Sequence, residues 1–192
     1  MDYVQSLRIT NISNLLKTLN LHLCDGNANK SHIIYLYGGG TNGKSKFIEA
    51  INDAYPNKLL KLPFSFIDRY NELMGRDKVA IDNYYNNDQY RLYVYPETPL
   101  DDNKNIDSHM RSIINLVKNF ENIGLNIPGS LRSPIKINKC FIIVSNIPLT
   151  DLSIKSEIIY CEFGNIFESN GKFEINDLII NSVKAAIDNL CI

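Results

Sequence analysis

Residues 32–45 read HIIYLYGGGTNGKS, and this stretch decides how the rest of the chain is interpreted. Its first six residues form a continuous apolar run of the kind that parallel strands show when both of their faces are buried. Three consecutive glycines follow, and residues 44–54 then show the pattern of a helix. The sequence therefore predicts a strand, a glycine-rich loop and a helix in immediate succession.

The loop between Gly38 and Ser45 matches the pattern G-x-x-x-x-G-K-[ST], and it lies between a strand and a helix as that pattern requires. Glycines let backbone N–H groups converge on phosphate oxygens, and the start of the helix adds the positive end of its dipole. We expect the Lys44 ammonium to reach the β- and γ-phosphates and the Ser45 hydroxyl to hold Mg²⁺. The expected nucleotide-binding residues are Gly38, Gly39, Gly40, Thr41, Asn42, Gly43, Lys44, Ser45 and Lys46.

Composition limits the class of protein. The 192 residues, 44% of them apolar and 21% charged, are enough for one domain with a core. A formal charge of -1 excludes a uniformly basic surface, so any nucleic-acid contact has to be local. The four cysteines show no metal-binding or disulfide-framework spacing, which indicates a reducing, intracellular compartment. No apolar run approaches the roughly 20 residues of a membrane helix, so no membrane partner is expected.

Apolar periodicity predicts the remaining elements of an α/β fold. Strands are expected at 59–62, 78–81, 90–95, 140–144 and 158–163, and helices at 9–23, 106–120 and 177–190. Because strands alternate with helices, we expect a central, mostly parallel sheet with helices on both faces and ligands at the carboxyl ends of the strands. The chain divides into an N-terminal helical segment, residues 1–30, and a nucleotide-binding domain, residues 31–192, that forms a single globular unit.

A Mg²⁺-dependent reaction needs a carboxylate near the loop, and two strand ends offer one. Asp82 follows the apolar run at 78–81, and Glu97 follows the run at 90–95. Neither acid has a second one beside it, and the residue after Asp82 is Asn83, which cannot act as a carboxylate base. On this reasoning either Asp82 or Glu97 is the metal-associated acid.

A third strand end carries an amide. The buried run at 140–144 ends in Ser145 and Asn146, and Pro148 then breaks the strand. An asparagine at a strand tip beside the phosphate loop can hydrogen-bond the attacking water or the γ-phosphate. We therefore expect Asn146 to sense whether the bound nucleotide is intact.

Taken in order, the phosphate loop, an acidic strand end and the tip at Asn146 resemble Walker A, Walker B and motif C of the superfamily 3 helicases. These are viral and plasmid P-loop ATPases of the AAA+ type. Residues 43–47, 68–70 and 79–85 look particularly like the helicase domain of circovirus-type replication initiators. The resemblance covers roughly residues 33–163.

The resemblance implies a P-loop NTPase fold of the AAA+ type that uses ATP and Mg²⁺. It implies that Ser45 and Asp82 hold the metal, with Glu97 still open as the alternative acid. The catalytic residues implied by it are Lys44, Asp82, Glu97 and Asn146.

The same resemblance implies contacts with nucleic acid. In those helicases a hairpin before motif C carries basic residues into the central channel of a hexamer. The corresponding residues here are Arg132, Lys136 and Lys139, in a stretch with no acid between Glu121 and Asp151. We therefore expect a hexameric homo-oligomer that binds single-stranded nucleic acid, with DNA favoured over RNA.

The family also uses an arginine after motif C to reach the γ-phosphate of the neighbouring subunit. This chain has no arginine beyond Arg132, and Lys155 is the cation at the matching place. A lysine is a single-point donor where arginine offers a fork. Loss of an arginine finger costs roughly 10³ to 10⁵ in rate in other P-loop enzymes, so slow hydrolysis is expected.

The leading interpretation is an ATP-dependent, helicase-like motor that translocates on or unwinds nucleic acid in viral genome replication. An alternative is a nucleotide-binding assembly or packaging protein with weak or lost hydrolysis. A third is a P-loop small-molecule kinase, although the sequence shows no arginine-rich cluster for a lid over the phosphates. A P-loop alone indicates a nucleotide and leaves the reaction open.

Overall fold

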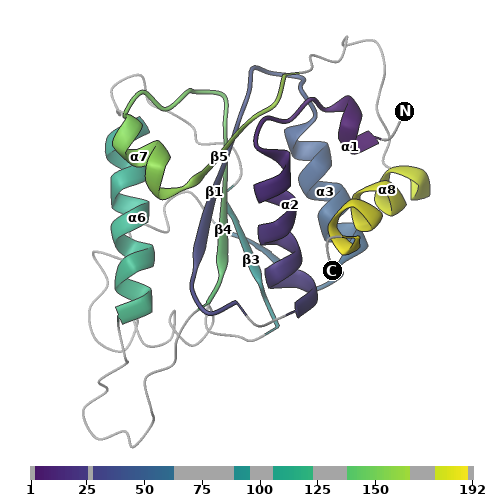
Figure 1. Cartoon of the computed structure of the whole chain (residues 1–192), viewed down its shortest axis with the longest axis horizontal. Helices are drawn as coiled ribbons and strands as arrows, with labels where there is room; N and C mark the ends of the chain where they lie inside the picture. The colour runs from purple at the N-terminus through teal and green to yellow at the C-terminus, as the bar shows by residue number, and fades with distance from the viewer. Residues whose placement is uncertain are drawn as a thin grey trace, which may run out of the picture.

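The centre of the fold is a sheet of five described strands, all parallel, in the order β2-β3-β4-β1-β5 (Figure 1). The strands are β1 (His32–Tyr37), β2 (Leu59–Lys61), β3 (Leu92–Tyr95), β4 (Cys140–Ser145) and β5 (Ile159–Glu162). The computed structural model describes residues 3–25, 28–62, 89–95, 106–122, 138–164 and 176–189. Within these ranges the predicted α/β class and parallel sheet are confirmed.

Helices cover both faces of the sheet, as Figure 1 shows. One face carries α1 (Tyr3–Ser6), α2 (Ile12–Asn20), α3 (Lys44–Ala54) and α8 (Asp177–Asp188). The opposite face carries α6 (Ile106–Asn122) and α7 (Leu152–Glu157). A π-helical turn, η1 (Leu21–Asp25), follows α2 directly. The edge strands of the sheet are β2 and β5.

The apolar run of β1 follows from its position between two cores. Ile34 and Leu36 face the core formed with α2, α3 and α8, whereas Ile33 and Tyr35 face the core formed with α6 and α7. Both faces of the strand are buried over residues 33–36, so these positions favour largely apolar side chains. Each fully buried side chain of this kind stabilises the fold by about 1.5–3 kcal/mol.

The described elements differ from the sequence prediction at several points. The first long helix begins at Ile12 rather than Ile9, because Asn11 adopts a left-handed conformation (φ 55°) and Ile9 forms an antiparallel bridge with Phe163. Helix α7 was not predicted; its N-terminus is capped by Asp151, whose side chain accepts a hydrogen bond from the Ser153 N–H. The strand predicted at 78–81 lies outside the described residues.

The N-terminal segment packs into the same core as the sheet. Leu7, Leu15 and Leu19 are fully buried there, and α2 contacts both β5 and α8. Thr10 donates its N–H to the Glu162 carbonyl at 2.9 Å and accepts the Glu162 N–H on its hydroxyl at 2.8 Å. The described part of residues 1–30 therefore continues the domain across the edge of β5.

The described cysteines form no disulfides, and the described helices include no membrane-spanning one. Cys140 and Cys161 are buried free thiols, and burial raises the pKa of Cys161 to about 12. A thiol held in its protonated form is a poor nucleophile, so these two side chains act as core residues. Among the helices of the described ranges, none combines the length and the apolar character needed to cross a bilayer.

His22 is a fully buried histidine close to the start of the sheet. Its Nε2 atom lies 2.9 Å from Nδ1 of His32, the first residue of β1. Burial lowers the pKa of His22 to about 4, and the positive charges of His32, Arg91 and Lys139 add to the shift. The imidazole of His22 is therefore neutral in the folded chain at neutral pH.

This neutral histidine predicts a pH-dependent stability. The unfolded chain binds the proton first, at its ordinary pKa of 6.5, so folding stability falls as pH decreases from about 6.5 to about 4. The loss at the lower limit is at most about 3 kcal/mol. Urea unfolding at several pH values should show a smaller loss for His22→Gln than for the unsubstituted chain. Equal losses in the two proteins would show that His22 does not carry the effect.

Candidate functional site

The phosphate loop connects the end of β1 to the start of α3. Gly38 donates its N–H to the carbonyl of Ser145 at 3.3 Å, which fixes the beginning of the loop against the end of β4. The loop then passes through left-handed conformations at Thr41 (φ 61°) and Gly43 (φ 87°) before α3 begins at Lys44. No side chain caps α3, so the amides of its first turn face the loop without a side-chain acceptor.

A Cβ atom at the first position of the loop would require its neighbours to shift. A Cβ atom on Gly38 would lie 1.7 Å from Nδ2 of Asn42 and 3.1 Å from the carbonyl oxygen of Phe163. Gly39 and Gly40 are exposed, and a Cβ atom at either would meet nothing within 4 Å. The close approach at Gly38 brings the loop backbone against the Asn42 side chain.

Lys44 is the centre of the site. Its ammonium donates to the carbonyl of Gly38 at 2.6 Å, to Oδ1 of Asn42 at 2.9 Å and to Oδ1 of Asn146 at 2.8 Å, with a longer contact of 3.4 Å to the carbonyl of Gly39. The residue is only 5% exposed. A buried ammonium is expensive unless oxygens replace its water, and these four oxygens do so.

Asn42 supports the fit of this site to an anion. Its side chain is 2% exposed, its Oδ1 accepts from Lys44, and its Nδ2 has no hydrogen-bond partner among the described residues. A buried donor without a partner costs about 1–3 kcal/mol. An oxygen of a bound phosphate would satisfy this donor, so the loop fits the triphosphate that its sequence indicates.

The remaining loop residues have different surroundings. The Thr41 hydroxyl donates to the Gly40 carbonyl at 2.7 Å, and Ser45 is exposed at the start of α3, where its hydroxyl is accessible to a metal ion. The Lys46 ammonium pairs with Glu49 at 2.8 Å, so this side chain lies along the helix rather than over the loop. Within the described ranges, no three His, Cys, Asp or Glu side chains gather into a metal site.

Asn146 reaches the loop because β4 lies next to β1. The two strands pair in parallel with Tyr37 opposite Ser145, so both strands end at the same level. Asn146 is the next residue along the chain, and its amide oxygen contacts Lys44. The structure brings together these two residues, 102 positions apart in sequence, as the order of the motifs predicts.

The two acids proposed from the sequence, Asp82 and Glu97, lie outside the described residues. Strand β3 ends at Tyr95, two positions before Glu97, and it pairs with β4 on one side and β2 on the other. Strand β4 lies between β3 and β1, and β1 also pairs with β5. Both edges of β1, β4 and β3 are therefore occupied by described strands.

Lys139 does not belong to an exposed basic loop, which corrects the expectation that it contacts nucleic acid. The residue is 4% exposed, and its ammonium donates to the carbonyl of Tyr90 at 2.6 Å beneath the ring of Tyr93. It also precedes β4, at the end of the sheet opposite the phosphate loop. The other two basic residues of that prediction, Arg132 and Lys136, lie outside the described ranges.

Lys155, the cation proposed to act on a neighbouring subunit, lies in α7. Its ammonium is 4.7 Å from the centre of the Tyr160 ring, which stacks in turn on Tyr35 and Tyr37. The residue is half-buried in this position. Its action across a subunit interface stays a prediction.

Sequence reasoning missed the contacts that fix the segment after Asn146. The Tyr35 hydroxyl donates to the carbonyl of Ile147 at 2.7 Å, and the side chain of Asp107 accepts from Thr150. The only signal was the tyrosine in the apolar run of β1, since a buried tyrosine hydroxyl needs an acceptor. The sequence around Tyr35 does not indicate that the acceptor is the carbonyl of Ile147.

Comparisons with known proteins add no family to this description. No family model matches the chain, and the search of curated proteins found no match. Function has therefore to be inferred from the phosphate loop, the strand order and the contact between Lys44 and Asn146.

The close approach at Gly38 predicts unequal effects of two alanine substitutions. Gly38→Ala should lower the free energy of unfolding by about 1–3 kcal/mol, because the new methyl group meets Asn42 and the Phe163 carbonyl. The matched variant Gly40→Ala has open space at its Cβ position and should change it by no more than about 1 kcal/mol in either direction. Urea denaturation measures both, and equal losses would contradict the geometry of the loop.

Proposed function

We propose that this chain is a P-loop ATPase of the AAA+ type, a helicase-like protein of superfamily 3 that uses ATP and Mg²⁺ and acts on single-stranded nucleic acid. The observation that carries the proposal is the contact of 2.8 Å between Asn146 Oδ1 and Lys44 Nζ. A strand-end amide aimed at the lysine of a phosphate loop is placed to meet the γ-phosphate that the lysine binds. The all-parallel sheet is compatible with this class of ATPase.

Strand order favours Glu97 over Asp82 as the acid of the site. The carboxyl end of β3 lies beside that of β4, and the chain reaches Glu97 two residues after β3 ends. Of the described strands, β3 is the one that pairs with β4 on the side away from β1. We therefore assign Glu97 the carboxylate that would hold the metal and its water.

Each residue of the proposed site has a distinct task. Bound Mg²⁺ would supply positive charge that neutralises the negative charge developing on the phosphates during hydrolysis. Ser45 offers a hydroxyl for it, and Lys44 exchanges its protein oxygens for phosphate oxygens. The Asn146 amide, which accepts from Lys44 in this structure, would hydrogen-bond the γ-phosphate or the attacking water.

Partners follow from the proposed class rather than from the described residues. We expect a hexameric ring, with Arg132 and Lys136 as the residues that contact a single strand of DNA or RNA. Lys139 is withdrawn from this set because it is buried. Lys155 remains the proposed cation for the neighbouring subunit's γ-phosphate.

A second candidate function is a nucleotide-binding assembly or packaging protein with weak hydrolysis. The observation in its favour is that protein oxygens already satisfy the Lys44 ammonium, which a nucleotide has to displace. The absence of any arginine after Arg132 in the sequence favours it as well. Stimulation of ATP hydrolysis by single-stranded DNA supports the helicase-like ATPase, whereas binding without turnover supports the assembly protein.

Lys44→Ala should lower ATP affinity and reduce turnover by about 10²-fold or more, because the charge that faces the phosphates is removed. Lys184→Ala, which removes an exposed lysine of α8, is the matched control and should leave both quantities unchanged. Calorimetric titration with ATP and a phosphate-release assay measure the two effects. Unchanged ATP affinity in Lys44→Ala would refute the phosphate-loop assignment.

Two carboxylate variants test the assignment of the acid. Glu97→Gln should lower turnover by about 10²-fold with ATP binding retained, because the group that orients the metal-bound water is lost. Asp82→Asn should change turnover by no more than about threefold, because on this assignment Asp82 does not hold the metal or its water. Both are measured as ATP hydrolysis at saturating Mg²⁺. The opposite ranking would return the role to Asp82 and leave the phosphate loop unaffected.

A further inference from the structure

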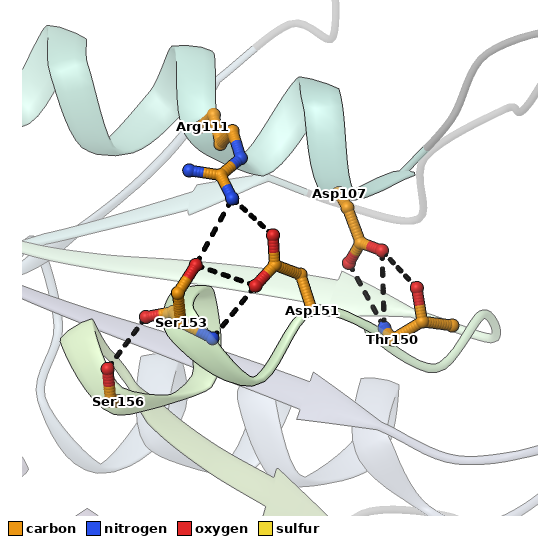
Figure 2. Close-up of polar contacts among 6 residues, drawn as sticks. All are labelled: Asp107, Arg111, Thr150, Asp151, Ser153 and Ser156. Carbon is orange, nitrogen blue, oxygen red and sulfur yellow. Dashed lines mark hydrogen bonds and ion pairs between the residues drawn. The ribbon is translucent and has the colours of Figure 1, made fainter.

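Helix α6 holds the segment that follows Asn146, as Figure 2 shows. Asp107, in the first turn of α6, accepts the Thr150 N–H on its two oxygens at 3.1 and 3.3 Å and also accepts the Thr150 hydroxyl. One turn further on, Arg111 donates to the Asp151 carboxylate and, at 3.1 Å, to the hydroxyl of Ser153. The start of α6 therefore binds two consecutive residues of the segment.

The two contacts differ in strength. Arg111 and Asp151 form an ion pair with side chains 54% and 29% exposed, and such surface pairs contribute little. Asp107 is 8% exposed, and its carboxylate is satisfied by a backbone N–H and a hydroxyl. Hydrogen bonds to an ionised acceptor are short and strong, and a buried carboxylate cannot exchange them for water at low cost. Asp107 is therefore the main anchor of Thr150.

The segment is fixed at its other end as well. The Ile147 N–H donates to the Ser145 hydroxyl at 3.0 Å, and the Tyr35 hydroxyl donates to the Ile147 carbonyl at 2.7 Å. Leu149, between the two anchors, is 1% exposed. Asn146 itself is an exposed residue, so its direction toward Lys44 depends on the backbone that these contacts hold.

We propose that Asp107 is a positioning residue that holds the Ile147–Thr150 segment so that the Asn146 amide faces the phosphate loop. The inference rests on the proposed function, because it assigns Asp107 an effect on how the site distinguishes ATP from ADP. Only a triphosphate presents the γ-phosphate that Asn146 meets. Loosening the Thr150 anchor therefore weakens ATP binding more than ADP binding.

The test compares ATP and ADP affinities in the full chain by calorimetry. Asp107→Asn and Thr150→Val should each weaken ATP binding about fivefold and change ADP binding less than about twofold. Thr150→Ser keeps the hydroxyl and should therefore keep the ATP affinity of the unsubstituted chain. Ser112→Ala, on an exposed position of the same helix, is the control and should change neither affinity.

A double variant separates positioning from a general structural role. In an Asn146→Ala background, Asp107→Asn should cause no further loss of ATP affinity, because the amide that it positions is gone. The value of kcat should fall about tenfold in Asp107→Asn while KM for ATP rises less steeply. A lower unfolding midpoint with an unchanged ratio of ATP to ADP affinity would overturn the inference. If Asp107→Asn does not fold, Thr150→Val gives the same test with the carboxylate retained.

A nucleotide-free measurement distinguishes failure of the inference from failure of the proposed function. The side-chain amide resonances of Asn146 should shift in Asp107→Asn and Thr150→Val and keep their positions in Thr150→Ser. If these shifts occur in a protein that binds no ATP, the proposed function fails and the positioning of Asn146 stands. If ATP binds and the amide resonances do not move, the proposed function stands and the inference fails.

Discussion

The ammonium of Lys44 is the group on which the rest of the site depends. It is buried, and the oxygens that replace its water come from two strand ends, the loop after β1 and Asn146 after β4. This arrangement is available only because β4 pairs directly with β1 and both strands end at the same level. The buried ammonium needs oxygens from both places, so its burial requires the loop conformation and the pairing of β1 with β4 together.

The two ends of the sheet have different chemistry. At the carboxyl end, polar groups surround Lys44, and Asn42 keeps a donor without a partner among the described residues. At the opposite end, the Lys139 ammonium donates to the Tyr90 carbonyl, and Nε2 of His22 contacts Nδ1 of His32. A parallel sheet places all its strand ends of one kind at one edge, which allows a single fold to keep the two environments apart.

Much of the fold could be predicted from the sequence, because β1, β4 and α3 are specified by local patterns. The continuous apolar runs and the glycine loop depend on neighbouring residues, and the proximity of Asn146 to Lys44 follows from parallel strands ending at one edge. The burial of Lys139 could not be predicted, since it depends on the Tyr90 carbonyl, which lies 49 positions earlier. Charge counted along a sequence does not distinguish a solvated lysine from one paired with a distant backbone oxygen.

A row of backbone hydrogen bonds crosses the carboxyl edge of the sheet from the N-terminal segment to β4. Gly164 donates to the Arg8 carbonyl, Phe163 donates to that of Tyr37, and Gly38 donates to that of Ser145. Tension applied to the chain before Arg8 would therefore reach Tyr37, directly before the phosphate loop, through two hydrogen-bonded links. Load on the other edge strand, β2, would have to cross β3 and β4 before it reached the same loop, so the two edges of the sheet are not mechanically equivalent.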